Sequence, residues 1–495
     1  MSGSSAYFKS ELARWLAFFR RITGKPAFIA GFLLCAFPTG LMLAVLTPPG
    51  WAPDESHHLA RAAGLLHGAV LGERKPINFA NDPNEPGWVA GVKVDTGLWQ
   101  VSVKNMTVIN NQQVFTAQNL LAARAVPAGH DKVFVDISNT VTYFPAAYLP
   151  ATLGLALGLA VHAPPYICFY LARLFMLAAF LTLGVLALWL TEYGEAALLT
   201  LLILPSTLLL AGSVSQDGVL IAMVCLACAA LTRGTQGFRL LSLVLMTLFL
   251  AAKPPYILLL GVFLLPLSGP GFWRRVRDAA LASVPVVLWM AVITVFVVVP
   301  FYQPPYHPGP LYAGAPGTPL YLTDPAANLH ILLAQPARFI TLPCATLVAQ
   351  SGWLLRGVIG IPKLFEADFP GIYDWLWGAC ILAAFAGLPF SARPQLLAPR
   401  TAQLNFVFVS FLLLATYGLI YIMAYVDWTK VGADQIWGMQ PRYVLPLAPF
   451  LLFAMPKFRC RFSLHPFVPA IPSILLGIAD LGYLPVKLVL SYYLH

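Results

Sequence analysis

A short polar segment, PDESHHLARA at 53–62, gathers two acids, two histidines and an arginine a few residues after the first long apolar stretch. Carboxylates and imidazoles often take protons from hydroxyl groups in catalysis. Asp54 and Glu55 are therefore candidate catalytic bases. The alternative is that both acids only stabilise the positive end of a helix that begins at Pro53. The adjacent histidines are a weak metal signal, because neighbouring side chains point about 100° apart on a helix.

The spacing within this segment favours a helix with one polar stripe. At about 100° per residue, Asp54, His58 and Arg61 share one side of the helix. Leu59 and Leu66 lie on the other side. We predict an amphipathic helix that lies on a membrane and shows an acid, an imidazole and a guanidinium to a cleft. In this cleft His58 and Arg61 would help to bind and orient the substrate.

Three later motifs add charged candidates beside apolar stretches. Asp217, in SVSQDG, lies where an ionisable group close to a bilayer is costly and usually functional, although it could simply cap a helix. Lys253, in AKPPY, ends an apolar stretch, where a helix dipole favours a cation. Arg442, in QPRYVLPLAP, stands at a helix start, where the dipole disfavours a cation. Arg442 therefore needs an anionic partner, a phosphate or a carboxylate, and we group the adjacent Tyr443 with it as substrate-binding.

The composition places these motifs in a membrane protein. Of 495 residues, 59% are hydrophobic and 10% charged, against about 45–50% and 25% in soluble proteins. Several continuous apolar stretches reach the roughly 17–25 residues that cross a bilayer as a helix, which excludes a β-barrel of alternating strands. We predict an all-α polytopic membrane protein. The net charge of +10 comes mostly from short connectors between apolar stretches, so it indicates membrane topology and excludes nucleic acid as a partner.

The basic connectors predict the topology. Lysines and arginines precede the first apolar stretch and recur at 232–239, 271–278, 391–400 and 456–461. The positive-inside rule puts all of them in the cytoplasm. Threading the chain through these constraints gives about eleven spans. Residues 142–161 then have both ends outside and form a juxtamembrane or re-entrant helix.

A single integral membrane domain, 1–495, follows from this topology, with residues 1–25 as a cytoplasmic interfacial leader. Two long loops, 49–141 and 301–371, face outside. Connectors longer than about 12–15 residues are uncommon unless they are functional. Since the candidate residues also lie on this face, we expect the chemistry there. Between 239–251 and 255–267, each short for a crossing, two separate spans agree with the charge rule better than one kinked helix does.

An ordered set of motifs along nearly the whole chain resembles a bacterial family of polytopic membrane proteins catalogued as domain of unknown function 2142. The motifs are PPGWAPDESHHLARAAGLLHG, TYFPAAYLP, LARLF, SVSQDG, AKPPY and QPRYVLPLAP. That family looks like a branch of the GT-C glycosyltransferases, which pass a sugar from a polyprenyl phosphate to an acceptor on the outer side of a membrane. The resemblance implies a catalytic acid at Asp54 or Glu55, a second acid at Asp217, a lysine at Lys253 and a juxtamembrane helix at 142–161.

The chemistry is coherent with this resemblance. Lys253 and Arg442 could stabilise a leaving phosphate, so no cofactor is required, although a divalent metal is compatible. A carboxylate opposite the phosphate would activate the acceptor hydroxyl, and attack from that side inverts the anomeric centre. The expected partners are a polyprenyl-phosphate-linked sugar, a glycan, lipid or protein acceptor, and membrane lipids.

We expect the protein in the bacterial cytoplasmic (inner) membrane, with its active site on the outer, periplasmic face. Two alternatives stay open. A transporter or flippase of lipid-linked sugars usually shows repeated halves and mid-membrane charges, and the sequence has no convincing internal repeat. A lipid-linked polysaccharide ligase or polymerase would instead use a diphosphate donor.

Overall fold

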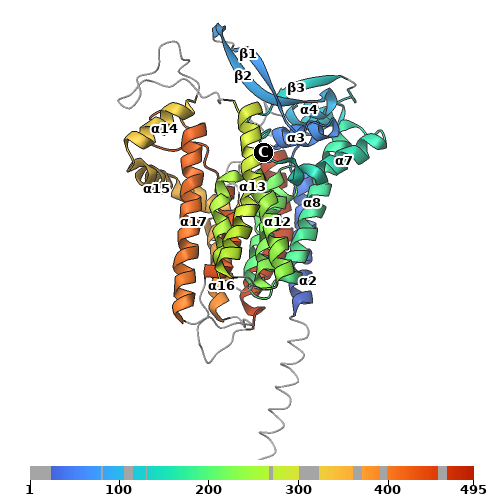
Figure 1. Ribbon diagram of the computed structural model, residues 1–495. Helices are drawn as coiled ribbons and strands as arrows, with labels where there is room; N and C mark the ends of the chain where they lie inside the picture. Colours follow the sequence, from blue (N-terminus) through green and yellow to red (C-terminus); the bar gives the residue numbers. More distant parts are fainter. Residues whose placement is uncertain are drawn as a thin grey trace, which may run out of the picture.

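The computed structural model is mostly helical (Figure 1). It describes residues 24–79, 82–104, 115–129, 131–266, 271–299, 323–360, 371–390, 399–454 and 465–494. Within them, five helices are long and apolar enough to cross a membrane. These are α2 (Lys25–Leu46), α8 (Pro165–Leu190), α13 (Phe272–Phe296), α17 (Pro399–Trp428) and α19 (Ile471–Tyr493).

Two bent helix pairs raise the number of candidate spans to seven if each pair crosses as one. The pair α10 (Pro205–Ala211) and α11 (Gln216–Thr232) is bent by 115°, and the pair α14 (Pro325–Ala334) and α15 (Arg338–Ile359) by 109°. The α14–α15 pair occupies the described part of the predicted outer loop 301–371. The predicted leader, residues 1–25, lies almost entirely outside the described residues.

The predicted count of about eleven spans is not confirmed. Shorter elements stand where several full spans were expected, and proline causes many of the breaks because it removes a helix hydrogen bond. They are α9 (Glu195–Ile203), α12 (Gln236–Ala252), α16 (Gly371–Ala386), α18 (Leu451–Ala454) and six 3-10 segments: η1 (Pro145–Tyr148), η2 (Pro254–Leu264), η3 (Leu388–Phe390), η4 (Pro441–Tyr443), η5 (Leu445–Phe450) and η6 (Val468–Ala470).

The basic connectors 232–239 and 271–278 lie at one end of the helix bundle, whereas 391–400 and 456–461 fall almost entirely outside the described residues. Arg239 contacts both neighbouring segments: its Nη2 donates to the Phe263 carbonyl at 3.1 Å, and its Nε lies 3.7 Å from Asp278 Oδ2. Connectors 232–239 and 271–278 therefore meet. At the same end, Lys25 Nζ donates to the Trp189 carbonyl at 2.9 Å. Helix α12 and the 3-10 segment η2 are two separate segments, as predicted, and not one kinked helix.

The opposite end carries a folded polar layer built from the first loop (Figure 1). Its antiparallel sheet has the order β1 (Glu73–Phe79), β2 (Asp82–Asp95), β3 (Lys132–Asp136). The sheet is joined by α3 (Glu55–Leu66), α4 (Thr96–Val103), α6 (Ala117–Arg124) and α7 (Leu149–Ala160). The mostly helical structure agrees with the predicted all-α class, and this small sheet is an addition that was not predicted.

Helix α3 forms where a helix was predicted, but its environment differs. It is buried along most of its length, and both Leu59 and Arg61 are at most 1% exposed. Gly64 lies so close to β2 that an added Cβ would meet Val92 Cβ at 3.0 Å. The expected amphipathic helix on the membrane surface is therefore wrong: α3 is a core element of the polar layer.

The predicted juxtamembrane helix at 142–161 corresponds to η1 and α7. Helix α7 packs on α8 through small residues, because a Cβ added at Gly154 would lie 2.6 Å from the Leu171 carbonyl oxygen. Its other side exposes leucines, with Leu153 60% exposed. At about 1.5 Å per residue, twelve residues are too short to cross a bilayer.

Candidate active site

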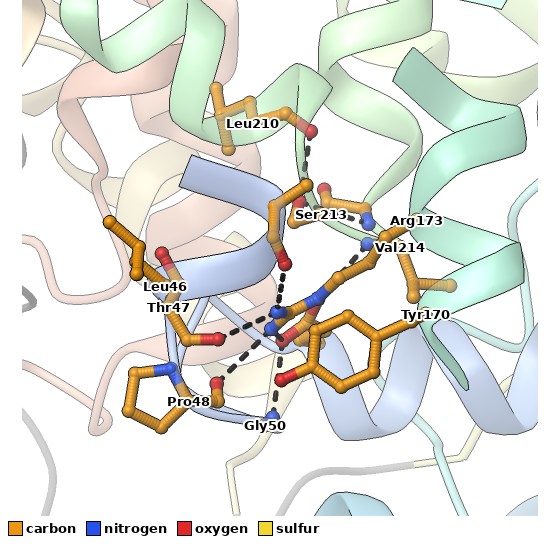
Figure 2. Close-up of polar contacts among 12 residues, drawn as sticks. Leu46, Thr47, Pro48, Gly50, Tyr170, Arg173, Leu210, Ser213 and Val214 are labelled. Carbon is orange, nitrogen blue, oxygen red and sulfur yellow. Dashed lines mark hydrogen bonds and ion pairs between the residues drawn. The ribbon is translucent and has the colours of Figure 1, made fainter. Parts of the chain in front are cut away.

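A buried ion pair fixes the backbone around the site. Arg173 of α8 and Glu55 of α3 are both 0% exposed, and Arg173 Nη2 lies 2.6 Å from Glu55 Oε2. Arg173 donates all five of its N–H groups: two to Glu55 and one each to the carbonyls of Ala44, Thr47 and Pro48. Figure 2 shows the guanidinium enclosed by these groups. The end of α2 is therefore tied to α3 and α8.

Glu55 extends the network to two further backbone segments. Its Oε2 accepts from the Gly50 N–H and its Oε1 from the Val214 N–H, each at 3.1 Å (Figure 2). Gly50 has φ +83°, a left-handed conformation that favours glycine. Val214 lies in the bend between α10 and α11. One carboxylate thus holds the loop that leads to Asp54 and the bend that leads to Asp217.

Asp54 and Asp217 are not simple helix caps. Asp54 precedes α3 in a left-handed conformation (φ 54°), and its side chain makes no capping hydrogen bond. A non-glycine residue in this region is uncommon and often lies at a functional site. For α11, Ser215 supplies the cap, because its hydroxyl accepts from the Asp217 N–H. Both carboxylates are therefore free for other partners.

Four charged side chains meet in one cluster. Arg442 Nη2 donates to Asp54 Oδ2 at 2.6 Å, and Arg442 Nε lies 3.0 Å from Asp217 Oδ2 without hydrogen-bond alignment. Lys253 Nζ lies 3.0 Å from Asp217 Oδ1. The prediction that Arg442 has an anionic partner is confirmed, and the partners are two carboxylates of the same chain. Tyr256 links the segment that carries Lys253 to the segment that carries Arg442, since its hydroxyl donates to the Tyr443 carbonyl at 2.7 Å.

The cluster is closed on one side and open on the other. The side chains of Arg442, Asp217 and Lys253 are 6%, 8% and 11% exposed, whereas that of Asp54 is 36% exposed. Within the described residues, Asp54 Oδ2 is bound to Arg442 and Oδ1 has no hydrogen-bond partner. Burial alone would raise the pKa of Asp54, but the charge of Arg442 outweighs it and holds the pKa below its ordinary value. Asp54 is therefore ionised and can accept a proton through Oδ1.

Aromatic residues and a histidine surround the charges. Lys253 Nζ lies 4.7 Å from the ring centre of Tyr143 and 5.5 Å from that of Tyr443. His58 Nδ1 lies 2.6 Å from the Tyr148 hydroxyl. Burial lowers the pKa of His58 to about 3, although Asp217 and Asp54 oppose this shift, so its imidazole is neutral at physiological pH. His58 thus contributes shape and hydrogen bonding, not charge.

A cavity of about 330 Å³ begins at Lys253. Its lining includes Lys253 and Tyr443 together with apolar residues of α13 and α17, among them Ile293 and Met423. A mostly apolar pocket with a few convergent polar groups is the usual form of a ligand site. The cluster and the cavity therefore make one composite site, polar at one end and apolar at the other.

Six of the eight predicted site residues meet here, and two lie elsewhere. His58, Tyr443 and the four charged residues surround the site. Glu55 instead pairs with Arg173, so all of its oxygens are occupied. Arg61 donates to the carbonyls of Ala69, Val70 and Tyr143 and is 0% exposed. Both residues are structural supports in this arrangement.

Three residues around the site were not predicted, although each lies in a conspicuous sequence motif. Arg173 lies in LARLF, and Tyr143 and Tyr148 lie in TYFPAAYLP, both motifs of the family resemblance. An arginine inside an apolar stretch is costly and usually has a partner.

Within the described residues, no group of three His, Cys, Asp or Glu side chains is placed to hold a metal ion. The expectation that a divalent metal is compatible with the site but not required stays a prediction.

Comparison with known proteins assigns the family. The sequence model of the family described as "Predicted membrane protein (DUF2142)" matches residues 37–451. The chain belongs to this family of membrane proteins. Searches of curated proteins and of solved structures find no match. The matched range includes all four charged residues of the cluster.

Proposed function

We propose that this protein is a GT-C-type membrane glycosyltransferase that moves a sugar from a polyprenyl phosphate to an acceptor hydroxyl. The observation that carries the proposal is the position of Lys253, at the junction of a charged cluster and an apolar cavity. A lipid-linked phosphate has this polarity, with an anionic head and a hydrocarbon tail. Arg442 supports the assignment, because its buried Nη1 has no partner within the described residues and can donate to a phosphate oxygen.

The reaction follows from these groups. Asp54 Oδ1 accepts the proton of the acceptor hydroxyl, whose oxygen attacks the anomeric carbon of the donor sugar. The bond between that carbon and the phosphate oxygen breaks, and the phosphate leaves with the electron pair. Lys253 and Arg442 stabilise the charge that develops on the phosphate. An attack from the side opposite the leaving phosphate inverts the anomeric configuration.

Replacing Lys253 by alanine tests the donor site. We expect Lys253→Ala to weaken binding of a short-chain prenyl phosphate glucoside by about 1.5–3 kcal/mol, the size of a charge-assisted hydrogen bond. Isothermal titration calorimetry in detergent measures the change. Lys104→Ala removes an exposed lysine at the end of α4 that does not line the cavity, and this variant should bind like the wild type. Equal binding by Lys253→Ala and the wild type would contradict the donor assignment.

The proposed location is the bacterial cytoplasmic membrane, with the N-terminus in the cytoplasm and the site on the periplasmic face. Two exposed positions at opposite ends of the bundle test this orientation: Lys93 in β2 and Gln236 at the start of α12. We expect Lys93→Cys to react with a membrane-impermeant maleimide in spheroplasts and Gln236→Cys to react only after permeabilisation. The wild type, with its own seven cysteines, gives the background. The reverse pattern would invert the proposed orientation.

A further inference from the structure

The lining of the cavity changes character along α17. Ile420, Met423 and Ala424 make an apolar wall, and one turn further Asp427 and Trp428 line the same cavity. At about 1.5 Å per residue, Asp427 lies roughly 10 Å from Ile420 along the helix. This end of α17 reaches the level of the polar layer (Figure 1). The cavity therefore has an apolar inner part and a polar outer part.

Asp427 is a carboxylate that lines this cavity. Within the described residues it makes no hydrogen bond and no ion pair, although it faces a cavity otherwise lined by apolar and neutral groups and by Lys253. Lys253 already pairs with Asp217. A partly buried carboxylate without a partner is costly. Donors from a bound ligand would offset this cost.

The backbone around Asp427 is held rigidly. Asn328 of α14 is 0% exposed, and its amide donates to the carbonyls of Tyr425 and Thr429, each at 2.9 Å. The Thr429 hydroxyl accepts from the Trp437 N–H at 3.0 Å. Preorganised walls of this kind are typical of binding sites. Asn328, which does not itself line the cavity, thus fixes the last turn of α17.

The base of the Trp428 side chain is closely packed as well. Gly438, at φ +82°, packs against it so closely that an added Cβ would lie 3.1 Å from Trp428 Cβ. Both residues line the cavity. An indole offers a flat apolar face to the C–H side of a sugar ring, and an adjacent carboxylate accepts hydrogen bonds from the ring hydroxyls. Carboxylate and indole together match the two kinds of surface on a sugar.

We infer that Asp427 and Trp428 form the subsite that binds the sugar of the lipid-linked donor. This inference rests on the proposed function and adds the recognition of the sugar to it. Asn139, which lines the same cavity, connects the subsite with the base: its Oδ1 lies 2.8 Å from Nδ1 of His57 in α3. A sugar held there lies between the phosphate-binding Lys253 and the segment that carries Asp54.

The test separates the sugar from the lipid phosphate. Citronellyl phosphate and its glucosyl and mannosyl derivatives are titrated against the detergent-solubilised wild type, Asp427→Asn, Trp428→Leu and a control. The control, Asp434→Asn, changes an exposed acid of the next loop that does not line the cavity. We expect the wild type and the control to bind at least one glycosylated ligand more tightly than citronellyl phosphate. Asp427→Asn should lose about 10- to 100-fold in affinity for that ligand, with unchanged affinity for citronellyl phosphate.

The outcomes are distinguishable. If the wild type binds citronellyl phosphate but shows no preference for any glycosylated form, the sugar subsite is overturned and the donor-phosphate assignment stands. The same holds if Asp427→Asn and Trp428→Leu both keep the wild-type preference. If the wild type binds neither form, the proposed function itself fails and the subsite fails with it. Loss of the preference in Asp427→Asn alone, with Trp428→Leu unfolded, still supports the subsite.

Discussion

Asp54→Asn is expected to lower the rate of sugar transfer by about 10²- to 10⁴-fold, the usual effect of removing a general base. The amide of asparagine cannot take the proton of an acceptor hydroxyl. Asparagine has nearly the size of aspartate and readily adopts the left-handed backbone conformation of residue 54. Arg442 keeps Asp217 as a partner, so the cluster is not left with an unpaired cation. Transfer from a prenyl phosphate sugar, measured on folded and monodisperse protein, gives the rate.

The control for this variant is Asp131→Asn, which makes the same change at an exposed acid of the first loop. It should transfer sugar at the wild-type rate. Donor affinity should fall little in Asp54→Asn, because Lys253 and Arg442 remain in place. If Asp54→Asn kept near wild-type transfer, Asp54 would be an electrostatic partner of Arg442 only, and the base would have to be sought at Asp217.

Glu55→Gln is expected to destabilise the protein by about 3–5 kcal/mol, the cost of breaking a buried ion pair from one side. The variant leaves Arg173 charged and 0% exposed, with a neutral amide against it. The matched control is Glu192→Gln, which breaks a partly exposed pair with Arg233 and should cost at most about 1 kcal/mol. The midpoint of thermal unfolding in detergent ranks the two variants against the wild type.

This comparison also separates two roles for Glu55. A structural support loses stability when it is neutralised, and any loss of transfer follows the loss of folded protein. A catalytic base would instead give a variant that is as stable as the wild type but inactive. A stable and inactive Glu55→Gln would therefore contradict the structural role assigned to the Glu55–Arg173 pair.

The sequence was sufficient to find most of the charged cluster. Asp217, Lys253 and Arg442 each sit next to an apolar stretch, where a charge needs a reason, and the basic connectors assigned all three to one face. Membrane topology converts such local signals into proximity, because every connector on one face lies near the others. The same cost of an unpaired charge predicted an anionic partner for Arg442, a phosphate or a carboxylate, and the structure shows two carboxylates.

The roles of Glu55 and Arg61 could not be predicted from helical spacing. A spacing of about 100° per residue put Asp54, His58 and Arg61 on one side of the helix. Asp54, however, lies before the helix in a left-handed conformation. The partners of Arg61 are carbonyls of irregular backbone, and no sequence pattern indicates which carbonyls will be left unpaired. Tertiary contacts of this kind decide whether a charged side chain serves chemistry or structure.

The short helical elements and the sheet were not predicted, for a different reason. Hydropathy measures whether a stretch is apolar, not whether it is straight. The break at 204–205 divides the apolar stretch that forms α9 and α10, whereas the turn at Lys253 separates two segments that the charge rule had already predicted to be separate. Strands β1 and β2 contain prolines and charged residues, which are poor strand formers, so their pairing depends on the layer that covers them.

The buried network of Glu55 and Arg173 has a consequence for the order in which the protein assembles. Glu55 and Arg173 are 118 residues apart in the chain, so the carboxylate is synthesised well before its guanidinium. At about 5–20 residues per second, the interval is roughly 6–24 seconds. During that time the first loop must stay hydrated on its side of the membrane, since its core acid has no counterion. Insertion of α8 delivers the counterion, and only then can the bend before Asp217 dock. The site can thus be completed only after the second candidate span has been made, because Asp217, Lys253 and Arg442 all follow Arg173 in the chain.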